Sequence, residues 1–468
     1  MMKKFSLYIL LAAFIFPSCK KYLDVNENPN SPTTAPINGL LGQVTYQSAL
    51  DEYRIAYLTT NYVQYFASPN PASASDIYES IDASGTWTSL YNTMTDIYDM
   101  QQLGANSGSS EHEGVAKILM ALNLKFVHDI WGDAPFTEAF TSETITPSYD
   151  GAQAIYAKCL SLLDEGIALL QQPTSAFNLD PSLDFIHHGS KSAWIKTAYA
   201  LKARFLSLVS KLPSYNPDAV LTALNNAYTS NSDDAQITTF SSRNPWAQVA
   251  LNNAALLLDG FLSTQYIDMM DGTIYGNFDP RLPMIATLTQ YSDYRGTPNG
   301  VGRIGTGIDD EESYLKVDGY YSSTNSPLII ISYAETKFLE AEAKFRKGTD
   351  MTGAYNAYLD GIRANMNKMG VSAVDRDAYV NSPIVSVGSA NLTLALIFKE
   401  KYKALFLSSE TWNDARRTNY NYSGFSLPAN AVLSTYIRRL DYPSVETSRN
   451  GSNVPTISGL DQKFWWDQ

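Results

Sequence analysis

The chain has 468 residues, of which 44% are apolar and 17% are charged, so its composition is that of a folded globular protein and excludes a largely disordered one. Its 34 basic and 47 acidic side chains give a formal net charge of −13 at pH 7. A chain this acidic has a negative surface field, which repels nucleic acid and anionic lipid. The net charge therefore argues against both as partners held by long-range electrostatics.

The N-terminus is predicted to be a targeting segment. Two lysines precede an apolar run over residues 5–16, which is shorter than the roughly 20 residues that a membrane-spanning helix needs. A serine and Cys19 follow, and a small residue before a cysteine is typical of a bacterial lipobox. We therefore predict a lipoprotein signal peptide over residues 1–18 and lipidation of Cys19, with an ordinary secretory signal as the alternative. Residues 19–37, rich in proline and asparagine, are predicted to form a lipidated tether.

Apolar residues recur with the period of an α-helix along much of the remaining chain. Cys159 lies on the apolar face of one such segment beside Ile155 and Leu162, so its thiol is predicted to be buried and inert. The sequence Trp131-Gly132-Asp133-Ala134-Pro135 contains helix stop signals and is interpreted as structural. Predicted helices cover residues 38–66, 86–103, 113–130, 152–170, 192–212, 218–228, 251–262 and 392–406.

The clearest helical pattern is that of Ile331–Met369, which predicts two helices folded back on each other. Large apolar and small residues alternate on one face of each half: Ala334, Phe338, Ala341 and Phe345 in the first half, and Tyr355, Tyr358, Ile362, Met366 and Met369 in the second. Gly348 between the halves is a C-terminal glycine, and Asp350 is an N-cap candidate. This pattern is typical of a tetratricopeptide-like hairpin, which needs similar hairpins to stack against.

The predicted fold is therefore mainly α, with tetratricopeptide-like helical hairpins stacked as a scaffold, long ligand-binding loops and a few short strands. Residues 38–468 are predicted to form a single domain. Within it, residues 272–325 are rich in glycine, aspartate, tyrosine and serine and form a loop-rich insert. A loop region of this length inside a domain is more often functional than idle.

Several short motifs follow one another beyond Cys19: Asp24–Asn30, Trp131–Ala139, Asn277–Leu282, Tyr333–Glu335, Lys401–Phe406, Trp412–Thr418 and Leu440–Pro443. In this order they resemble the SusD/RagB-type nutrient-binding lipoproteins of the Bacteroidetes, and the resemblance covers essentially the whole chain. It implies a non-enzymatic lipoprotein, anchored in the outer membrane by its N-terminal lipid and facing the cell exterior. It also implies a SusC-like TonB-dependent transporter as the partner and an oligosaccharide, or in some members a peptide, as the ligand.

Two regions outside the regular helices combine aromatic rings with polar groups. A glycan site needs both, because rings stack on the apolar faces of sugars while amides, carboxylates and guanidinium groups bind hydroxyls. Asp76 is a polar candidate in the first region, and Trp87 begins a helix, where core packing is slightly the better interpretation. At least one ring of the adjacent pair Tyr320 and Tyr321 should be exposed. The predicted ligand-binding residues are Tyr65, Asn70, Tyr78, Trp87, Tyr291, Tyr294, Arg295, Tyr320, Tyr321 and Asn325.

Other classes of site find less support. Asp309–Glu312 lacks the spacing of an EF-hand and is interpreted as a solvated acidic loop, and the four histidines do not form a zinc-ligand pattern, so neither a metal site nor a cofactor is predicted. A glycoside hydrolase needs two carboxylates that flank a cleft, and Asp271, Asp279 and Asp293 lie in a suitable loop. An adaptor that binds another protein through its helical hairpins is a third possibility.

Overall fold

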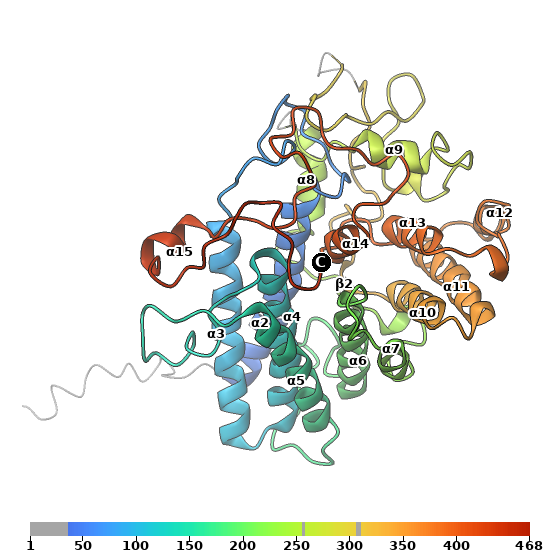
Figure 1. Cartoon of the computed structure of the whole chain (residues 1–468). Coiled ribbons are helices and arrows are strands. Elements are labelled where there is room, and N and C mark those ends of the chain that lie inside the picture. The colour runs from blue at the N-terminus through green and yellow to red at the C-terminus, as the bar shows by residue number, and fades with distance from the viewer. Residues whose placement is uncertain (1–35, 255–257, 306–309) are drawn as a thin grey trace, which may run out of the picture.

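The described chain is mainly helical, as predicted (Figure 1). This computed structural model describes residues 36–254, 258–305 and 310–468, so the predicted signal peptide, Cys19 and nearly all of the tether lie outside the described residues. The α-helices are α2 (Ile37–Thr59), α3 (Ser84–Ser107), α4 (Ser110–Trp131), α5 (Ala152–Leu170), α6 (Lys191–Leu208), α7 (Pro217–Leu224), α8 (Pro245–Ala254), α9 (Thr264–Met270), α10 (Tyr333–Lys347), α11 (Met351–Met369), α12 (Ala373–Val380), α13 (Leu394–Ala404), α14 (Glu410–Arg417) and α15 (Ser444–Arg449). The short 3-10 helices are η2 (Asn231–Asp233), η3 (Leu282–Met284) and η4 (Ser389–Asn391), and the strands are β1 (Ala235–Ile237) and β2 (Leu328–Ile331).

Two groups of helices make the scaffold (Figure 1). In one group the consecutive helices α2 to α6 pack against one another, and in the other α10 packs against α7, α11 and α13. Helix α6 contacts both α7 and α10 and so joins the groups. β1 and β2 pair antiparallel, with Ala235 opposite Ile331. None of the helices in the three described ranges is both long and apolar enough to cross a bilayer.

The predicted helical hairpin is present as α10 and α11. Ser332 caps α10 by accepting a hydrogen bond from a backbone N–H of its first turn (3.2 Å), and Gly348 ends the helix with a φ of +73°. Asp350 caps α11 in the same way (2.8 Å). The predicted apolar faces meet in one buried cluster that includes Phe338, Ala341, Tyr358, Ile362 and Met366. The hairpin is confirmed, and its assignment to the tetratricopeptide class stays a prediction.

Several predicted helix boundaries are wrong, because caps and isolated bridges override the apolar period. The helix predicted over residues 251–262 is α8, which begins at Pro245 because the side chain of Asn244 accepts the N–H of Trp246 (2.7 Å). Residues 261 and 262 instead form isolated bridges with other loops. Helices α9, α12, α14 and α15 were not predicted, since six to eight residues are too few to show a helical period.

Two predicted structural roles are confirmed. Trp131 is completely buried, and Gly132 has a φ of +86° where α4 ends. Asp133 accepts the N–H of Ala152 (2.7 Å) at the start of α5, so the motif after α4 turns the chain into the next helix. Cys159 is completely buried in α5, and burial raises the pKa of its thiol, which keeps the thiol protonated and inert.

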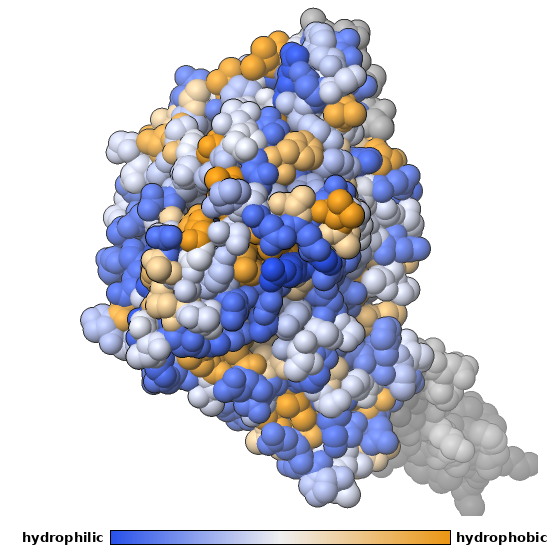
Figure 2. Space-filling view, turned by 90° about the vertical axis from the view of Figure 1, so that its right-hand side faces the viewer, coloured by the Kyte–Doolittle hydropathy of each residue, from blue (hydrophilic) through white to orange (hydrophobic). Residues whose placement is uncertain are grey.

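The outer face of the second helix group is largely hydrophilic. Figure 2 views the molecule from the side on which α11 and α12 lie, and its apolar residues form small separate groups among hydrophilic ones. Val374 at the start of α12 is one exposed apolar residue of this kind, with 79% of its surface exposed. Scattered apolar residues are ordinary on protein surfaces, so this face is the exterior of the scaffold.

Candidate functional site

Three loop segments that are distant in sequence meet at one end of the molecule (Figure 1). The first covers residues 60–83, the second residues 258–305 and 310–325, and the third residues 419–443. The first and second segments are joined where the N–H of Ala72 donates to the carbonyl of Gly300 (3.1 Å), and the second and third where the N–H of Ala429 donates to the carbonyl of Asn299 (3.0 Å). Together they bring parts of both predicted ligand-binding regions to one end of the molecule. We call this assembly the loop cap; it consists of residues 60–83, 258–305, 310–325 and 419–443.

Asp76 ties the loop cap together from inside. Its carboxylate is completely buried and accepts hydrogen bonds from the side-chain amides of Asn61 (2.8 Å) and Asn299 (2.6 Å) and from the N–H groups of Ser68 (3.0 Å) and Gly300 (2.9 Å). Burial raises the pKa of Asp76, while these four donors oppose that rise. Its interpretation as a ligand contact is therefore wrong, because protein groups occupy its acceptor positions.

Replacing Asp76 with alanine should lower the free energy of unfolding by about 3 kcal/mol, since four buried donors lose their acceptor. Amide hydrogen exchange should accelerate at Ser68 and Gly300 before the helices are affected. Asp82→Ala is the matched control, because Asp82 also links two segments, through Ser444, but is exposed. Urea unfolding and exchange followed by mass spectrometry measure both effects, and equal losses in the two variants would contradict the assigned role of Asp76.

A group of exposed rings lies on the turn formed by residues 289–295. Tyr291 is 52% exposed, and the guanidinium carbon of Arg295 lies 4.2 Å from the centre of its ring. Tyr294 is half-buried, and its ring centre lies 6.2 Å from that of Phe278, which is 45% exposed. We call Phe278, Tyr291, Tyr294 and Arg295 the aromatic platform. Phe278 was not among the predicted residues, although an aromatic ring in the loop-rich insert is a signal that could have found it.

Hydrogen bonds hold the aromatic platform in place. The N–H of Thr289 donates to the carbonyl of Asp293 (2.8 Å), which closes the turn, and the hydroxyl of Tyr291 donates to Glu311 (3.2 Å). Arg295 donates to both carboxylate oxygens of Asp293, at 2.7 Å for the closest pair. The hydrogen bonds from Arg295 and then from Thr289 lower the pKa of Asp293. The platform thus presents flat rings and a charge-neutralised guanidinium to solvent.

Three predicted ligand-binding residues lie instead in the core. Tyr65 is 1% exposed, and its hydroxyl donates to the carbonyl of Tyr402 (2.6 Å). Trp87 is 4% exposed and packs edge-on against Trp131, with ring centres 5.0 Å apart. Tyr78 has no exposed surface. Their prediction as ligand contacts is wrong, whereas core packing, the better interpretation of Trp87, is confirmed. Trp87 lies on α3, and Tyr65 and Tyr78 lie in loops, where a ring is as readily buried by distant segments as it is exposed.

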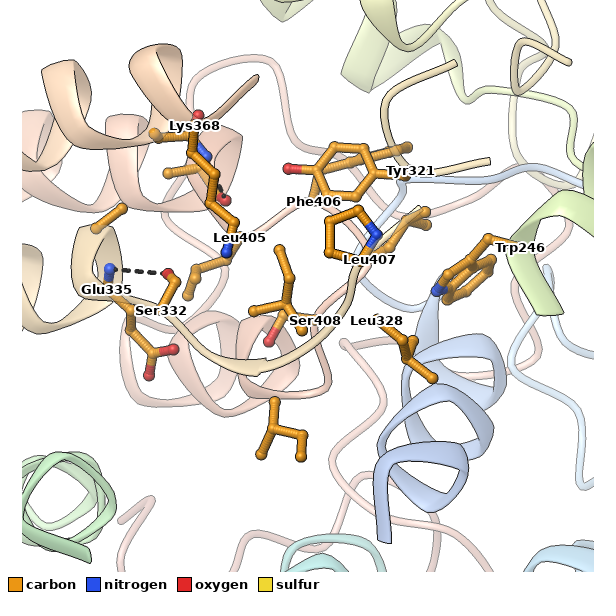
Figure 3. Close-up of a pocket in the computed structure, with 16 residues that line it drawn as sticks. Trp246, Tyr321, Leu328, Ser332, Glu335, Lys368, Leu405, Phe406, Leu407 and Ser408 are labelled. Atoms are coloured by element: carbon orange, nitrogen blue, oxygen red, sulfur yellow. Dashed lines mark hydrogen bonds between the residues drawn. The ribbon is translucent and has the colours of Figure 1, made fainter. Parts of the chain in front are cut away.

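Tyr321 is also buried, beside a small internal cavity (Figure 3). It lines this cavity with Trp246, Phe406 and Leu328, and its ring centre lies 5.4 Å from that of Phe406. The cavity has a volume of about 30 Å³, which is room for one or two water molecules and too small for a sugar. Tyr321 therefore contributes to packing, and its prediction as a ligand contact is wrong.

The remaining predicted residues lie in different places. Tyr320 is half-buried against Tyr321, with ring centres 4.8 Å apart. Asn325 is exposed on the turn whose Thr324 carbonyl accepts the N–H of Asn244, at the start of α8. Asn70 is exposed in the loop cap, beside the Pro69 carbonyl that accepts the N–H of Arg303. Asn70, Tyr320, Asn325 and the predicted residues of the aromatic platform thus stay candidates within the loop cap.

The three carboxylates considered for a hydrolase do not face one another across a cleft. Asp279 is completely buried and pairs with Arg281 (2.6 Å) and Lys403 (3.3 Å). Asp293 is held by Arg295, and Asp271 accepts the N–H of Thr273 (2.8 Å). A glycosidase needs one carboxylate to protonate the leaving group and another to act on the opposite face, so these three give the hydrolase alternative no support.

The acidic run Asp309–Glu312 was predicted to be a solvated loop, and this prediction fails for its last residue. Asp309 lies outside the described residues, and Glu312 is 3% exposed and accepts the N–H groups of Ile304 (2.5 Å) and Gly305 (2.9 Å). Glu312 therefore anchors a loop and was wrongly interpreted as solvated. In the described ranges, no three His, Cys, Asp or Glu side chains are grouped closely enough to hold a metal ion.

Comparisons with known proteins agree on one family. The model of the SusD-like family described as "Starch-binding associating with outer membrane" matches residues 29–443. A SusD/RagB family protein from Bacteroides thetaiotaomicron has a similar structure, with a TM-score of 0.77, 22% identity, and coverage of 93% of this chain and 99% of that chain. A chitin-binding SusD homologue from Flavobacterium johnsoniae gives a TM-score of 0.78 at 20% identity, covering 92% of this chain and 98% of that chain. Comparison with curated proteins gives no significant match. The family model spans most of the sequence and the solved structures share the fold, so the chain belongs to the SusD-like family.

Proposed function

We propose that this protein is a non-catalytic binding protein that captures an oligosaccharide at the cell surface and delivers it to a SusC-like TonB-dependent transporter. Residues 38–468 act as one domain, and the loop cap, which includes the described residues of the insert at 272–325, carries the ligand site. The description of the family and the printed name of the chitin-binding homologue support a glycan as the ligand.

The exposed aromatic platform is the observation that carries this proposal. Large rings that are half exposed leave apolar surface in contact with water. A sugar ring can cover that surface with its C–H face. The guanidinium of Arg295 beside Tyr291 supplies donors for hydroxyls, and its pairing with Asp293 keeps the platform from attracting anions strongly. Asn70 adds an amide elsewhere on the loop cap.

Replacing Tyr291 and Tyr294 together with alanine should weaken glycan binding by about 10- to 100-fold, because two stacking surfaces are lost. The melting temperature should change little, because both rings lie partly exposed on a surface turn. Isothermal calorimetry with a pool of neutral oligosaccharides measures the binding. Phe177→Ala is the control: Phe177 is 53% exposed but follows α5, outside the loop cap.

The same experiment separates the alternatives. Unchanged affinity in the double variant would remove the aromatic platform from the site. Binding of peptide pools and not of oligosaccharides would favour the peptide-binding alternative, and shortened oligosaccharides after incubation would favour a hydrolase. A ligand present at 100 times its dissociation constant adds about 2.7 kcal/mol of stability, so thermal shift detects a productive pool.

We propose further that lipid on Cys19 anchors the protein to the outer membrane, facing the cell exterior. Cys19→Ala should abolish incorporation of labelled fatty acid and move the protein from the membrane to the soluble fraction, because the acyl chains supply the binding energy, at about 0.8 kcal/mol per buried methylene. Cys159→Ala is the control, since Cys159 is buried in the core. Co-purification of a TonB-dependent transporter from detergent-solubilised membranes tests the partner, and its absence would contradict delivery to such a transporter.

A further inference from the structure

A cleft of about 420 Å³ with a mixed polar and apolar lining lies in the loop cap, and no residue of the aromatic platform lines it. Helix α9 forms one wall, residues 298–301 the second and residues 424–429 the third, with Gln64 between them. Its volume lies within the range of about 300–1,000 Å³ that small-molecule sites occupy. All three loop segments contribute to the cleft, so it exists only in the folded loop cap.

The walls of the cleft are fixed by hydrogen bonds before any ligand arrives. The side-chain amide of Gln64 donates to the carbonyl of Ser426 (2.7 Å), and that of Gln265 donates to the carbonyl of Ser423 (2.9 Å). The N–H of Thr264 donates to the carbonyl of Thr297 (3.0 Å). A preformed site spends little binding energy on ordering its own loops, which favours its use for a ligand.

The polar lining of the cleft carries a negative charge. Gln64 and Gln265 each use one N–H of the side-chain amide on a backbone carbonyl and keep a second for a ligand, and the carboxylate of Asp268 supplies the charge. Thr264 lies one helical turn before Asp268 and lines the same cleft. The lining, all of it within the described residues, contains no lysine, arginine or histidine. Burial, and then the nearby Asp271, raise the pKa of Asp268.

The rim of the cleft is apolar. Val301 is 47% exposed and Leu427 is 36% exposed, and Ile274 and Pro298 extend the apolar edge. Apolar edges around amide, hydroxyl and carboxylate groups suit a ring that has C–H groups on its faces and hydroxyls around its perimeter, which is the chemistry of a neutral sugar. A carboxylate or sulfate in this cleft would lie beside Asp268 without a cation to compensate, and like charges placed together in a partly buried site repel each other strongly.

We propose that this cleft binds a neutral, hydroxyl-bearing sugar residue and rejects carboxylated or sulfated sugars, with Asp268 as the specificity-determining acceptor. The inference rests on the proposed glycan binding and adds the class of glycan. The acidic balance of the whole chain acts in the same direction, because it lowers the local concentration of anionic ligands.

The test compares a pool of neutral oligosaccharides with the same pool after oxidation of its primary hydroxyls to carboxylates. The wild-type protein should bind the oxidised pool at least tenfold more weakly by calorimetry. Asp268→Lys should remove or reverse this difference in affinity between the neutral and the oxidised pool, because the lysine attracts the carboxylates that the aspartate repels. Asp271→Lys is the matched control: it makes the same change of charge nearby on a residue that does not line the cleft, and it should narrow the difference between the two pools much less than Asp268→Lys does.

A second variant tests the cleft without altering charge. Leu427→Trp places a bulkier side chain at the rim, which fills part of the cleft, and should weaken binding of the neutral pool at least tenfold. If the neutral pool binds but Asp268→Lys leaves the difference between the two pools unchanged, or Leu427→Trp leaves the affinity unchanged, the assignment of the cleft is overturned while glycan binding stands. If neither pool binds the wild-type protein, the proposed function and the assignment of the cleft fall together.

Discussion

Replacing Arg281 with methionine is expected to lower the free energy of unfolding by about 3–5 kcal/mol, one of the two largest effects expected for a single substitution in this protein. Arg281 is completely buried and donates to Asp279 (2.6 Å) and Glu400 (3.1 Å), which are buried as well. It also donates to the side chain of Asn365 (2.9 Å). Methionine fills much of the same volume but leaves Asp279 with Lys403 (3.3 Å) and Glu400 with Lys399 (3.2 Å) as their remaining close cations.

Arg295→Met is the matched control for Arg281. Both arginines follow an aspartate by two residues and bind it with two nitrogens, but the side chains of Arg295 and Asp293 are 50% and 45% exposed. An exposed pair contributes about 0–1 kcal/mol, so urea unfolding of this variant should differ little from that of the wild type. Losses of equal size in the two variants would contradict the importance of burial.

Acid should reduce the difference between the wild type and Arg281→Met. Burial alone would raise the pKa of Asp279, but the charges of Arg281 and Lys403 hold it well below its usual value of 3.8. A carboxyl group whose pKa is lower in the folded state stabilises that state above its unfolded pKa, and this contribution is lost as the pH falls through the folded pKa. The difference should therefore be full at pH 7 and shrink below about pH 4.

Replacing Trp466 with alanine is expected to cost about 3–5 kcal/mol, because a large buried ring is removed and a cavity is left. Trp466 has no exposed surface, stacks on Phe464 with ring centres 5.7 Å apart, and lies 4.9 Å from the guanidinium carbon of Arg416. Arg416 is itself completely buried and joins α14 to the carbonyl of Asp129 on α4 (2.7 Å). Loss of the ring should therefore loosen the contact between α14 and α4.

Trp465→Ala is the control for Trp466, since it removes the same side chain one position earlier. Trp465 is half-buried, and its ring centre lies 5.2 Å from that of Tyr156. Its loss should cost about 1–2 kcal/mol. Trp466→Phe, which keeps an aromatic ring against Arg416, should recover part of the stability lost in Trp466→Ala. Urea unfolding monitored by circular dichroism measures all three variants, and a smaller loss for Trp466→Ala than for Trp465→Ala would contradict the packing argument.

The helical scaffold could be predicted well from the sequence because its determinants are local. The hairpin of α10 and α11 has a sustained apolar period, a C-terminal glycine and an N-cap aspartate, and each of these acts within a few residues. The residues of α8 were predicted wrongly because the start of this helix depends on Asn244. Helix α14 was missed because its eight residues show little helical period. The last residues of the chain gave no prediction, since nothing local indicates that Trp466 is buried.

The candidate site was less predictable because exposure is decided by segments far away in the sequence. A loop that contains aromatic residues has the same kind of amino-acid composition whether its rings pack inward or face solvent. Tyr65 is buried by Tyr402, 337 residues later, whereas Tyr291 lies on a surface turn and is 52% exposed. The cleft that Asp268 lines was missed for the same reason, since its walls come from three separate segments.

By itself the sequence determined the mainly helical class, the helical hairpin, the family resemblance and the chemical types available in the loops. Only the tertiary structure decided which of those groups a ligand can reach. Asp279-Pro280-Arg281 and Asp293-Tyr294-Arg295 have the same spacing and form the same bidentate pair. The first is enclosed by α11 and α13 and stabilises the fold, and the second is solvated on the aromatic platform. The physical reason is that local sequence specifies a pair's geometry, whereas its burial, and with it the strength of its electrostatics, depends on what the distant chain places around it.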